Sequence, residues 1–105
     1  MERGNKVIDE RVSEWLEALK DATGQIDEFV AYVAEQGATK LFASGGIFAR
    51  FDNGWGVAAR LICPDGLPPF VRYKSWHVDW TVDTMKEVKN DWRAAVDRAA
   101  SGGAS

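Results

Sequence analysis

The sequence predicts an α+β protein with two N-terminal helices, a three-stranded antiparallel sheet and a C-terminal helix. Apolar residues recur at helical spacing in the first third of the chain and again near its end, and an Asn-Gly pair separates two apolar runs in the middle. Short connections between neighbouring strands favour an antiparallel sheet covered by helices over alternating βα units. The 105 residues are enough for one domain with its own core.

The first helix is predicted over residues 7–21. Its apolar residues share an arc of about 100°, which is typical of a helix that faces a core. They are Ile8, Val12, Trp15, Leu16 and Leu19. Thr23 and Gly24 predict a break, because Thr is a frequent N-cap and Gly is a poor helix former. A second helix over residues 25–36 is expected to end at Gly37, which suits a left-handed C-terminal cap.

A β-hairpin is predicted with its turn at Asn53 and Gly54. A two-residue turn of this kind needs positive φ at both residues, and Asn-Gly meets that need best. The turn would pair Arg50 with Val57 across the hairpin. It would also place Arg50 and Arg60 on opposite faces, because side chains alternate along a strand.

A third strand is predicted over residues 70–78, after a Pro-Asp-Gly turn, and a C-terminal helix over residues 82–100. The spacing from Thr84 to Glu87 matches a capping box. The helix would bury one apolar face made of Met85, Val88, Trp92, Ala95, Val96 and Ala99. Residues 1–100 are therefore predicted as a single domain and residues 101–105 as a flexible tail.

The composition limits the compartment and the chemistry. Hydrophobic residues at 46% and charged residues at 28% are typical of a soluble globular domain, and no apolar run reaches the length of a membrane span. The single Cys63 rules out an internal disulfide and favours a reducing compartment. We expect a cytoplasmic protein that does not bind membranes.

Catalytic and metal-binding motifs are scarce. Cys63 and His77, the one cysteine and the one histidine, would lie on neighbouring strands, but Cys63 ends an apolar run where a thiol is usually buried and inert. His77 and Asp79 could form half of a metal site or a surface hydrogen bond, and zinc would still need further ligands. We therefore expect no enzyme activity, no metal and no cofactor.

Glycine patterns do not predict a phosphate-binding loop. Gly45-Gly46 and Gly54-x-Gly56 lack the following helix and the lysine that such loops require. Gly56 is instead expected to lie within a strand beneath the ring of Phe51, since an aromatic ring can compensate for a glycine in a sheet.

Acidic residues concentrate at the N-terminal end of the chain. Residues 1–38 hold nine Asp or Glu against four Lys or Arg. Four of these acids share one side of the first predicted helix, opposite its apolar arc: Glu10, Glu14, Glu17 and Asp21. No Lys or Arg four residues onward compensates them, so they repel one another. This acidic strip is either a solvated helix face or a docking site for a basic partner.

Both faces of the predicted hairpin carry apolar residues. Either the three helices cover both faces, or one face stays open for a partner or a second copy of the chain. Trp55 and Trp76 are the candidate anchors there, because Trp is enriched where partners bind tightly.

An alternative function is the binding of single-stranded nucleic acid on the sheet. Arg72, Lys74 and Trp80 are the candidate residues, since cations with interleaved aromatic rings suit phosphates and bases. The net charge of −3 and the separation of Arg50 from Arg60 weigh against it.

The sequence thus favours a small acidic protein-binding module without enzyme activity. It would mask the basic surface of a partner protein through the acidic strip, Trp55 and Trp76. Immunity proteins, antitoxins and phage anti-defence proteins are comparable in size and charge alone.

Overall fold

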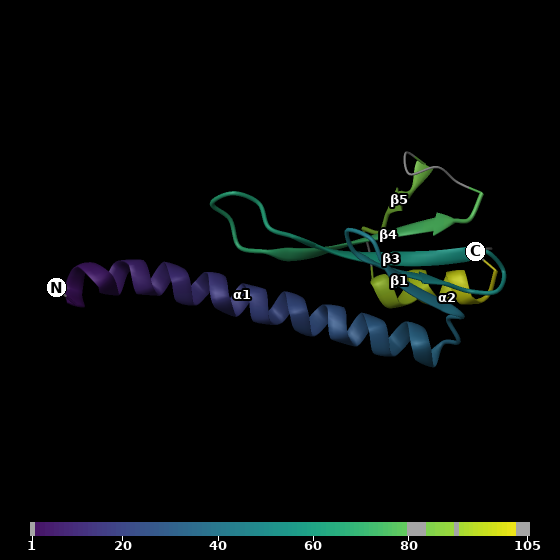
Figure 1. Cartoon of the computed structure of the whole chain (residues 1–105), viewed down its shortest axis with the longest axis horizontal. Coiled ribbons are helices and arrows are strands. Elements are labelled where there is room, and N and C mark those ends of the chain that lie inside the picture. The colour runs from purple at the N-terminus through teal and green to yellow at the C-terminus, as the bar shows by residue number, and fades with distance from the viewer. Residues whose placement is uncertain (1, 80–83, 90, 103–105) are drawn as a thin grey trace.

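The computed structural model describes residues 2–79, 84–89 and 91–102, and the side chains of the first helix from residue 10 onward. The fold is α+β: a long helix, a five-stranded antiparallel sheet and a short C-terminal helix (Figure 1). The elements are α1 (Glu2–Glu35), β1 (Lys40–Ala43), β2 (Ile47–Arg50), β3 (Trp55–Ile62), β4 (Phe70–His77), β5 (Lys86–Glu87) and α2 (Trp92–Ala100).

The N-terminal region forms one helix, so the prediction of two helices is wrong. Gly24 adopts no positive φ, and the hydroxyl of Thr23 donates to the carbonyl of Lys20 at 3.0 Å inside the helix. The apolar residues alternate at spacings of four and three across the expected break: Leu19, Ala22, Ile26, Phe29 and Val33. Because burial of this stripe extends through the Gly, tertiary packing outweighs the roughly 1 kcal/mol that Gly costs in a helix.

The sheet is a meander in which every strand pairs with the next one along the chain. It has five strands instead of the predicted three. The run expected as one strand before Asn53 divides at Gly45, whose φ is 73°, and the N–H of Ser44 donates to the carbonyl of Gly46 at 3.0 Å. The strand expected over residues 70–78 is β4.

The hairpin at Asn53 and Gly54 is present, but its register differs from the prediction by one residue. Only Gly54 has a positive φ, and the N–H of Phe51 donates to the carbonyl of Trp55 at 2.8 Å, so the loop holds three residues. Arg50 consequently pairs with Gly56, not with Val57. A shift of one residue moves side chains to the other face, which decides where the strand cations lie.

Gly56 lies beneath an aromatic ring, although not the one expected. A Cβ at Gly56 would stand 2.6 Å from Cε2 of Trp76, which pairs with Gly56 from β4. Phe51 is buried in the core on the other face of the sheet.

The C-terminal helix is shorter than predicted. It begins at Trp92, after the N-cap Asp91, whose side chain accepts from the N–H of Arg93 at 3.1 Å. The expected capping box is wrong, since Glu87 belongs to β5 and pairs with Lys74 of β4. Edge pairing with β4 thus replaces the first turns of the expected helix. Residues 82, 83, 90 and 103–105 lie outside the described part of the chain.

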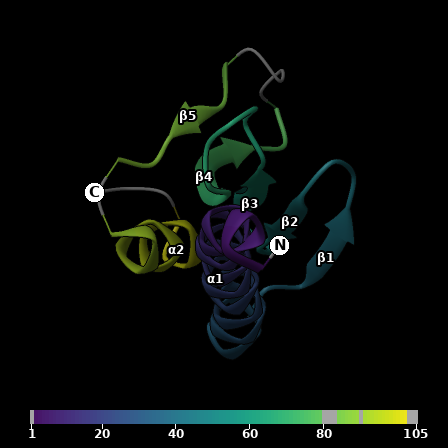
Figure 2. The same cartoon turned by 90° about the vertical axis from the view of Figure 1, so that its left-hand side faces the viewer.

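Both helices cover the same face of the sheet, as the view along α1 shows (Figure 2). The core lies between them and the odd-numbered residues of β2, β3 and β4, and its largest fully buried side chains are Phe29, Val33, Val57 and Val96. The even-numbered strand residues form the opposite face, which we call the open face. Among the described residues, no helix is long and apolar enough to cross a membrane.

Candidate functional site

Every Lys and Arg between residues 39 and 80 lies on the open face. The register aligns Lys40 with Arg50 in one cross-strand row, and Arg60 with Arg72 in another. Lys74 stands in the row between them. Since two residues along a strand span roughly 6.6 Å, the outer rows are about 13 Å apart. The prediction that Arg50 and Arg60 lie on opposite faces of the sheet is therefore wrong.

Three aromatic rings pack together among these cations on the open face. The rings of Phe42 and Phe48 stack with centroids 5.3 Å apart, and the ring of Trp76 meets both edge-on at 6.3 and 6.1 Å. Phe42 keeps 46% of its surface exposed. This aromatic cluster offers a ring face to a flat ligand.

Three of the five cations border a cavity of about 290 Å³ on the open face. Arg60, Arg72 and Lys74 supply charge, and the apolar lining comes from Phe48, Ala58, Ile62 and Met85. Ser44, Gly45, Gly46 and Ala59 complete the wall. The cavity therefore combines an apolar surface with three positive charges.

Among the described residues, Glu87 is the acidic side chain that forms an ion pair with a cation of this cavity. Oε2 of Glu87 lies 3.8 Å from Nε of Arg72, and both side chains are about half exposed. The guanidinium of Arg72 also lies 5.8 Å from the ring centroid of Phe70. The cations around the cavity thus exceed this acid by two, and an exposed ion pair of this kind adds little stability.

Two donor groups flank Gly56 on the open face without a hydrogen-bond partner among the described residues. They are Nε of Arg50 and Nε1 of Trp76, both buried at the atom level. Buried polar groups are normally paired, so these two exceptions mark a row of the sheet whose polar groups the fold itself does not satisfy.

Comparison with protein-family models, with curated protein sequences and with solved structures found no match. The assignment therefore depends on the geometry of the chain itself.

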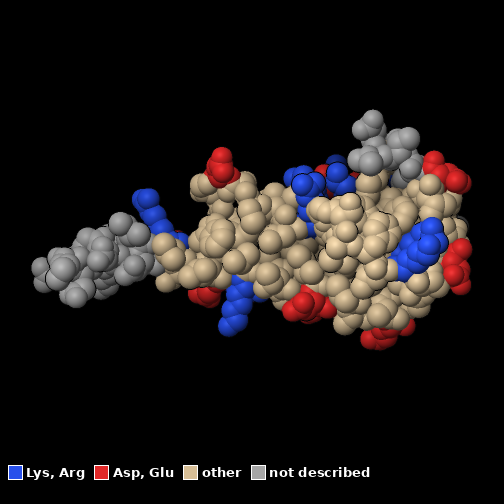
Figure 3. All heavy atoms as spheres, viewed as in Figure 1, with Lys and Arg blue, Asp and Glu red and all other residues tan. Residues whose placement is uncertain are grey.

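The acidic strip lies on the outer side of α1, and each of its four residues is exposed. None of them forms an ion pair with another described side chain. On the surface drawn in Figure 3, several acidic side chains line the lower edge along α1, and a group of Lys and Arg gathers over the strands at the upper middle. The acidic strip and the cations of the open face thus belong to different elements, the strip to α1 and the cations to the strands.

The two tryptophans expected to join the acidic strip do not share a surface. Trp76 is on the open face, and Trp55 is half-buried on the face that the helices cover. Trp80, the third candidate, lies outside the described residues. The structure therefore separates the acidic strip from Trp76 and brings Trp76 close to the cations.

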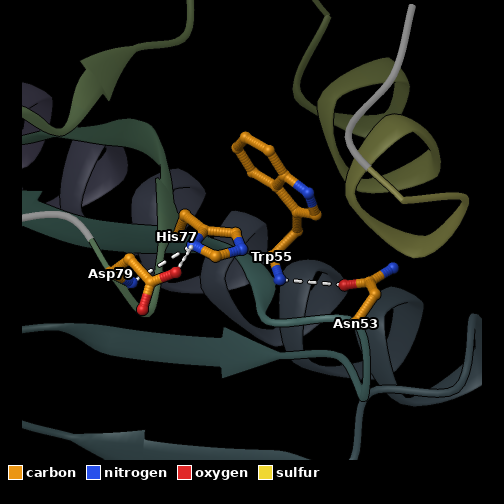
Figure 4. Close-up of polar contacts among 4 residues, drawn as sticks. All are labelled: Asn53, Trp55, His77 and Asp79. Carbon is orange, nitrogen blue, oxygen red and sulfur yellow. Dashed lines mark hydrogen bonds and ion pairs between the residues drawn. The ribbon is translucent and has the colours of Figure 1, made fainter.

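His77 makes local contacts around the hairpin turn (Figure 4). Its Nδ1 accepts from the backbone N–H of Asp79 at 3.1 Å and lies 3.5 Å from the carboxylate of Asp79. Its ring meets that of Trp55 edge-on at 4.7 Å. In the described part of the chain, no group of three His, Cys, Asp or Glu side chains could hold a metal ion.

Cys63 and His77 do not form a catalytic pair in this structure. Cys63 follows Ile62, which pairs with Phe70, whereas His77 pairs with Trp55 at the other end of β3. Eight positions along the strand, roughly 26 Å, separate Cys63 from the partner of His77. Cys63 is also exposed, so the expectation of a buried thiol is wrong.

Two tyrosines on the helix-covered side have raised pKa values. The Tyr32 hydroxyl donates to Oδ1 of Asp97 at 2.7 Å, and this hydrogen bond is the main reason that the pKa of Tyr32 is raised. Burial raises the pKa of Tyr73, which has no hydrogen-bond partner for its hydroxyl among the described residues. Both groups belong to the scaffold, on the side away from the open face.

The residues that sequence reasoning missed are Lys40, Phe42, Arg50 and Arg60. A three-residue loop ending in Gly at positive φ is a common alternative to the two-residue turn. That alternative was the signal that would have aligned Arg50 with Arg60.

Proposed function

We propose that this protein binds single-stranded nucleic acid on its open face. The observation that carries the proposal is the register of the sheet, because it gathers five cations on one face around the aromatic cluster. A positively charged surface with stacking rings is the arrangement by which many proteins hold single strands.

The cations would contact the phosphate backbone. The row of Lys40 and Arg50 stands about 13 Å from the row of Arg60 and Arg72, and the row between them carries Phe42, Phe48 and Lys74. A strand crossing the sheet would therefore meet both cations and rings. Phosphate contacts supply most of the affinity of nonspecific nucleic-acid binding. The overall charge of −3 does not oppose this, since nine of the 16 acidic residues lie in residues 1–38, before the first strand.

The aromatic cluster favours single strands over duplexes. Phe42 offers an exposed ring, and a base can stack on such a ring only when it is free of its own neighbours. Every base has a ring face, so we expect little dependence on sequence.

The acidic strip would orient the encounter. A polyanion is repelled by α1 and attracted by the strands, and a field of this kind raises the rate of productive approach.

The test is the binding of a short fluorescent oligonucleotide, measured by anisotropy at low salt. We expect wild-type protein to bind, and the double variant Arg72→Ala/Lys74→Ala to bind at least about tenfold more weakly. Arg11→Ala/Lys20→Ala is the matched control, because it removes the same charge from exposed positions on α1.

Binding that is lost equally in both double variants would overturn the proposal, as would a wild-type protein that does not bind. Light scattering of the free protein should accompany the titration, because a second copy covering the open face would compete with the oligonucleotide.

A second candidate is the binding of a basic partner protein by the acidic strip. The observation that favours it is that the four exposed carboxylates have no ion pair with other described side chains. The same part of α1 exposes apolar side chains on its other side, with Val12 48% and Leu16 51% exposed.

This second candidate predicts capture of a protein from the native host that is lost in Glu14→Lys/Glu17→Lys and weakened by salt. Capture that survives this charge reversal would remove the acidic strip as the docking surface.

A further inference from the structure

We propose that the cavity on the open face holds one nucleotide of the bound strand, with its base in the apolar hollow and its phosphate on Arg60, Arg72 and Lys74. This inference rests on the proposed function and adds to it a specific site. The aromatic cluster alone would stack bases on the surface, whereas the cavity would take one base below the surface.

The lining suits a ligand with two different parts. The three cations come from two adjacent strands, Arg60 directly opposite Arg72 and Lys74 one row away. The apolar part of the lining includes Ile62 and Met85. A ligand that satisfies both joins a weakly polar body to an anion, as a nucleotide does. A purely apolar ligand would leave the charges without a counter-ion.

The volume of the cavity agrees with the binding of a single nucleotide. Binding sites for small molecules usually range from about 300 to 1,000 Å³, and this cavity of about 290 Å³ is at the lower limit. One base with its sugar is a ligand of this order. Ala58 pairs with Phe48 of β2 on one side and with Lys74 of β4 on the other. Because its side chain is the smallest of the three, Ala58 forms the floor of the cavity.

The net charge of the cavity also suits a ligand with a phosphate group. Glu87 neutralises part of Arg72 at 3.8 Å, so the cavity offers a net charge of about two positive units. Binding would replace this exposed ion pair with charge-assisted hydrogen bonds from guanidinium groups to phosphate oxygens, which are stronger.

A filling substitution tests the cavity while leaving every charge in place. Ala58→Leu adds apolar volume at the floor, and Ala94→Leu adds the same side chain at an exposed position on α2 as a control. The probes are a nucleoside 5′-monophosphate, followed by NMR chemical shifts and calorimetry, and the fluorescent oligonucleotide.

We expect the mononucleotide to bind wild-type protein, to shift the amide signals of Arg60, Arg72 and Met85, and to bind Ala58→Leu at least about tenfold more weakly. The oligonucleotide should lose less affinity, because Lys40, Arg50 and Phe42 still contact it. If Ala58→Leu does not fold, Met85→Glu is the second variant, since it adds a negative charge at the cavity without altering the sheet.

The failures are distinguishable. An oligonucleotide that binds while the mononucleotide does not, or while Ala58→Leu and Met85→Glu bind the mononucleotide as tightly as wild type, would overturn the cavity and leave the proposed function. A protein that binds neither probe would overturn both. Shifts confined to the aromatic cluster would also contradict the cavity, because they would place the base on the surface.

Discussion

Asn53 shows how one side chain can determine the geometry of a turn. Its Oδ1 accepts from the N–H of Trp55 at 2.8 Å, and its Nδ2 donates to the carbonyl of Ala99 at 2.8 Å. The second bond satisfies a carbonyl at the end of α2, where helices leave such groups without internal partners. Asn53 thus ties the hairpin to α2 and holds the three-residue loop that aligns the cations of the open face.

Asn53→Ala should therefore destabilise the protein by about 1 to 2 kcal/mol, since each hydrogen bond contributes on the order of 1 kcal/mol. Asp52→Ala, in the same loop and exposed, is the control and should change little. Urea unfolding followed by circular dichroism measures both. Equal stability of the two variants would contradict the role assigned to Asn53.

Gly56 is fixed by the close approach of its neighbours, because a Cβ there would collide with the carbonyl of Ala49 and stand 2.6 Å from the ring of Trp76. We expect Gly56→Ala to cost about 1 to 3 kcal/mol, the usual range for overpacking. The measurement is again urea unfolding. If Gly56→Ala leaves the free energy of unfolding unchanged, Trp76 does not cover this strand as described.

At the level of elements, α1 is the clearest case of packing outweighing a local signal. Gly24 is on the exposed side of the helix, and a Cβ added there would have no neighbour within 4 Å. Gly24→Ala should stabilise the protein by about 0.5 to 1 kcal/mol, because Ala is the better helix former. Thermal unfolding provides the measurement.

The stability of the variant Thr23→Ala distinguishes a single continuous helix from two helices with a break at Thr23. If Thr23 were an N-cap, this substitution would lower the free energy of unfolding by about 1 kcal/mol. Inside a continuous helix, the same substitution should leave the free energy of unfolding almost unchanged. A clear loss of stability in Thr23→Ala, together with no gain in Gly24→Ala, would contradict the single helix.

The predictable part of the fold was its class and its strongest local signals. The α+β class, the hairpin turn and the strand at β4 followed from apolar spacing and turn residues. Local patterns could not reveal what depends on distant contacts. The path of β5 depends on pairing with Ser75 and Lys74 of β4, and Met85 and Val88 fitted a helical spacing by coincidence.

The candidate site was predicted only in fragments for the same reason. Arg72 and Lys74 were identified because they lie on one strand, where alternation alone decides the face. Arg50 and Arg60 belong to different strands, so their alignment depends on the loop that Asn53 stabilises. The predicted loop was one residue too short. The sequence analysis therefore placed Arg50 and Arg60 on opposite faces of the sheet and did not predict the cations of the open face.

At the scale of the whole molecule, the two helices are joined by the Tyr32–Asp97 hydrogen bond on the side away from the open face. The pKa values of Tyr32 and Tyr73 are raised when the protein is folded. The neutral phenols therefore stabilise the fold fully below the ordinary tyrosine pKa of about 10, and this contribution is lost as the pH rises through the raised values.

We expect unfolding by urea to become easier above about pH 10, and Tyr32→Phe/Tyr73→Phe to reduce that dependence on pH. The measurement is the urea midpoint from about pH 8 to about pH 11, which brackets the ordinary tyrosine pKa. A double variant with the same alkaline loss as wild type would show that other groups cause it.

The five cations on the open face lead to the most direct test, which is the salt dependence of oligonucleotide binding. For single strands, the logarithm of the binding constant falls with the logarithm of salt concentration by about 0.7 for each phosphate contacted. If all five cations of the open face contact phosphates, the predicted slope is about −3.5, and Arg72→Ala/Lys74→Ala should reduce its size by about 1.4. A slope near zero, or a slope that this double variant leaves unchanged, would contradict nucleic-acid binding on the open face.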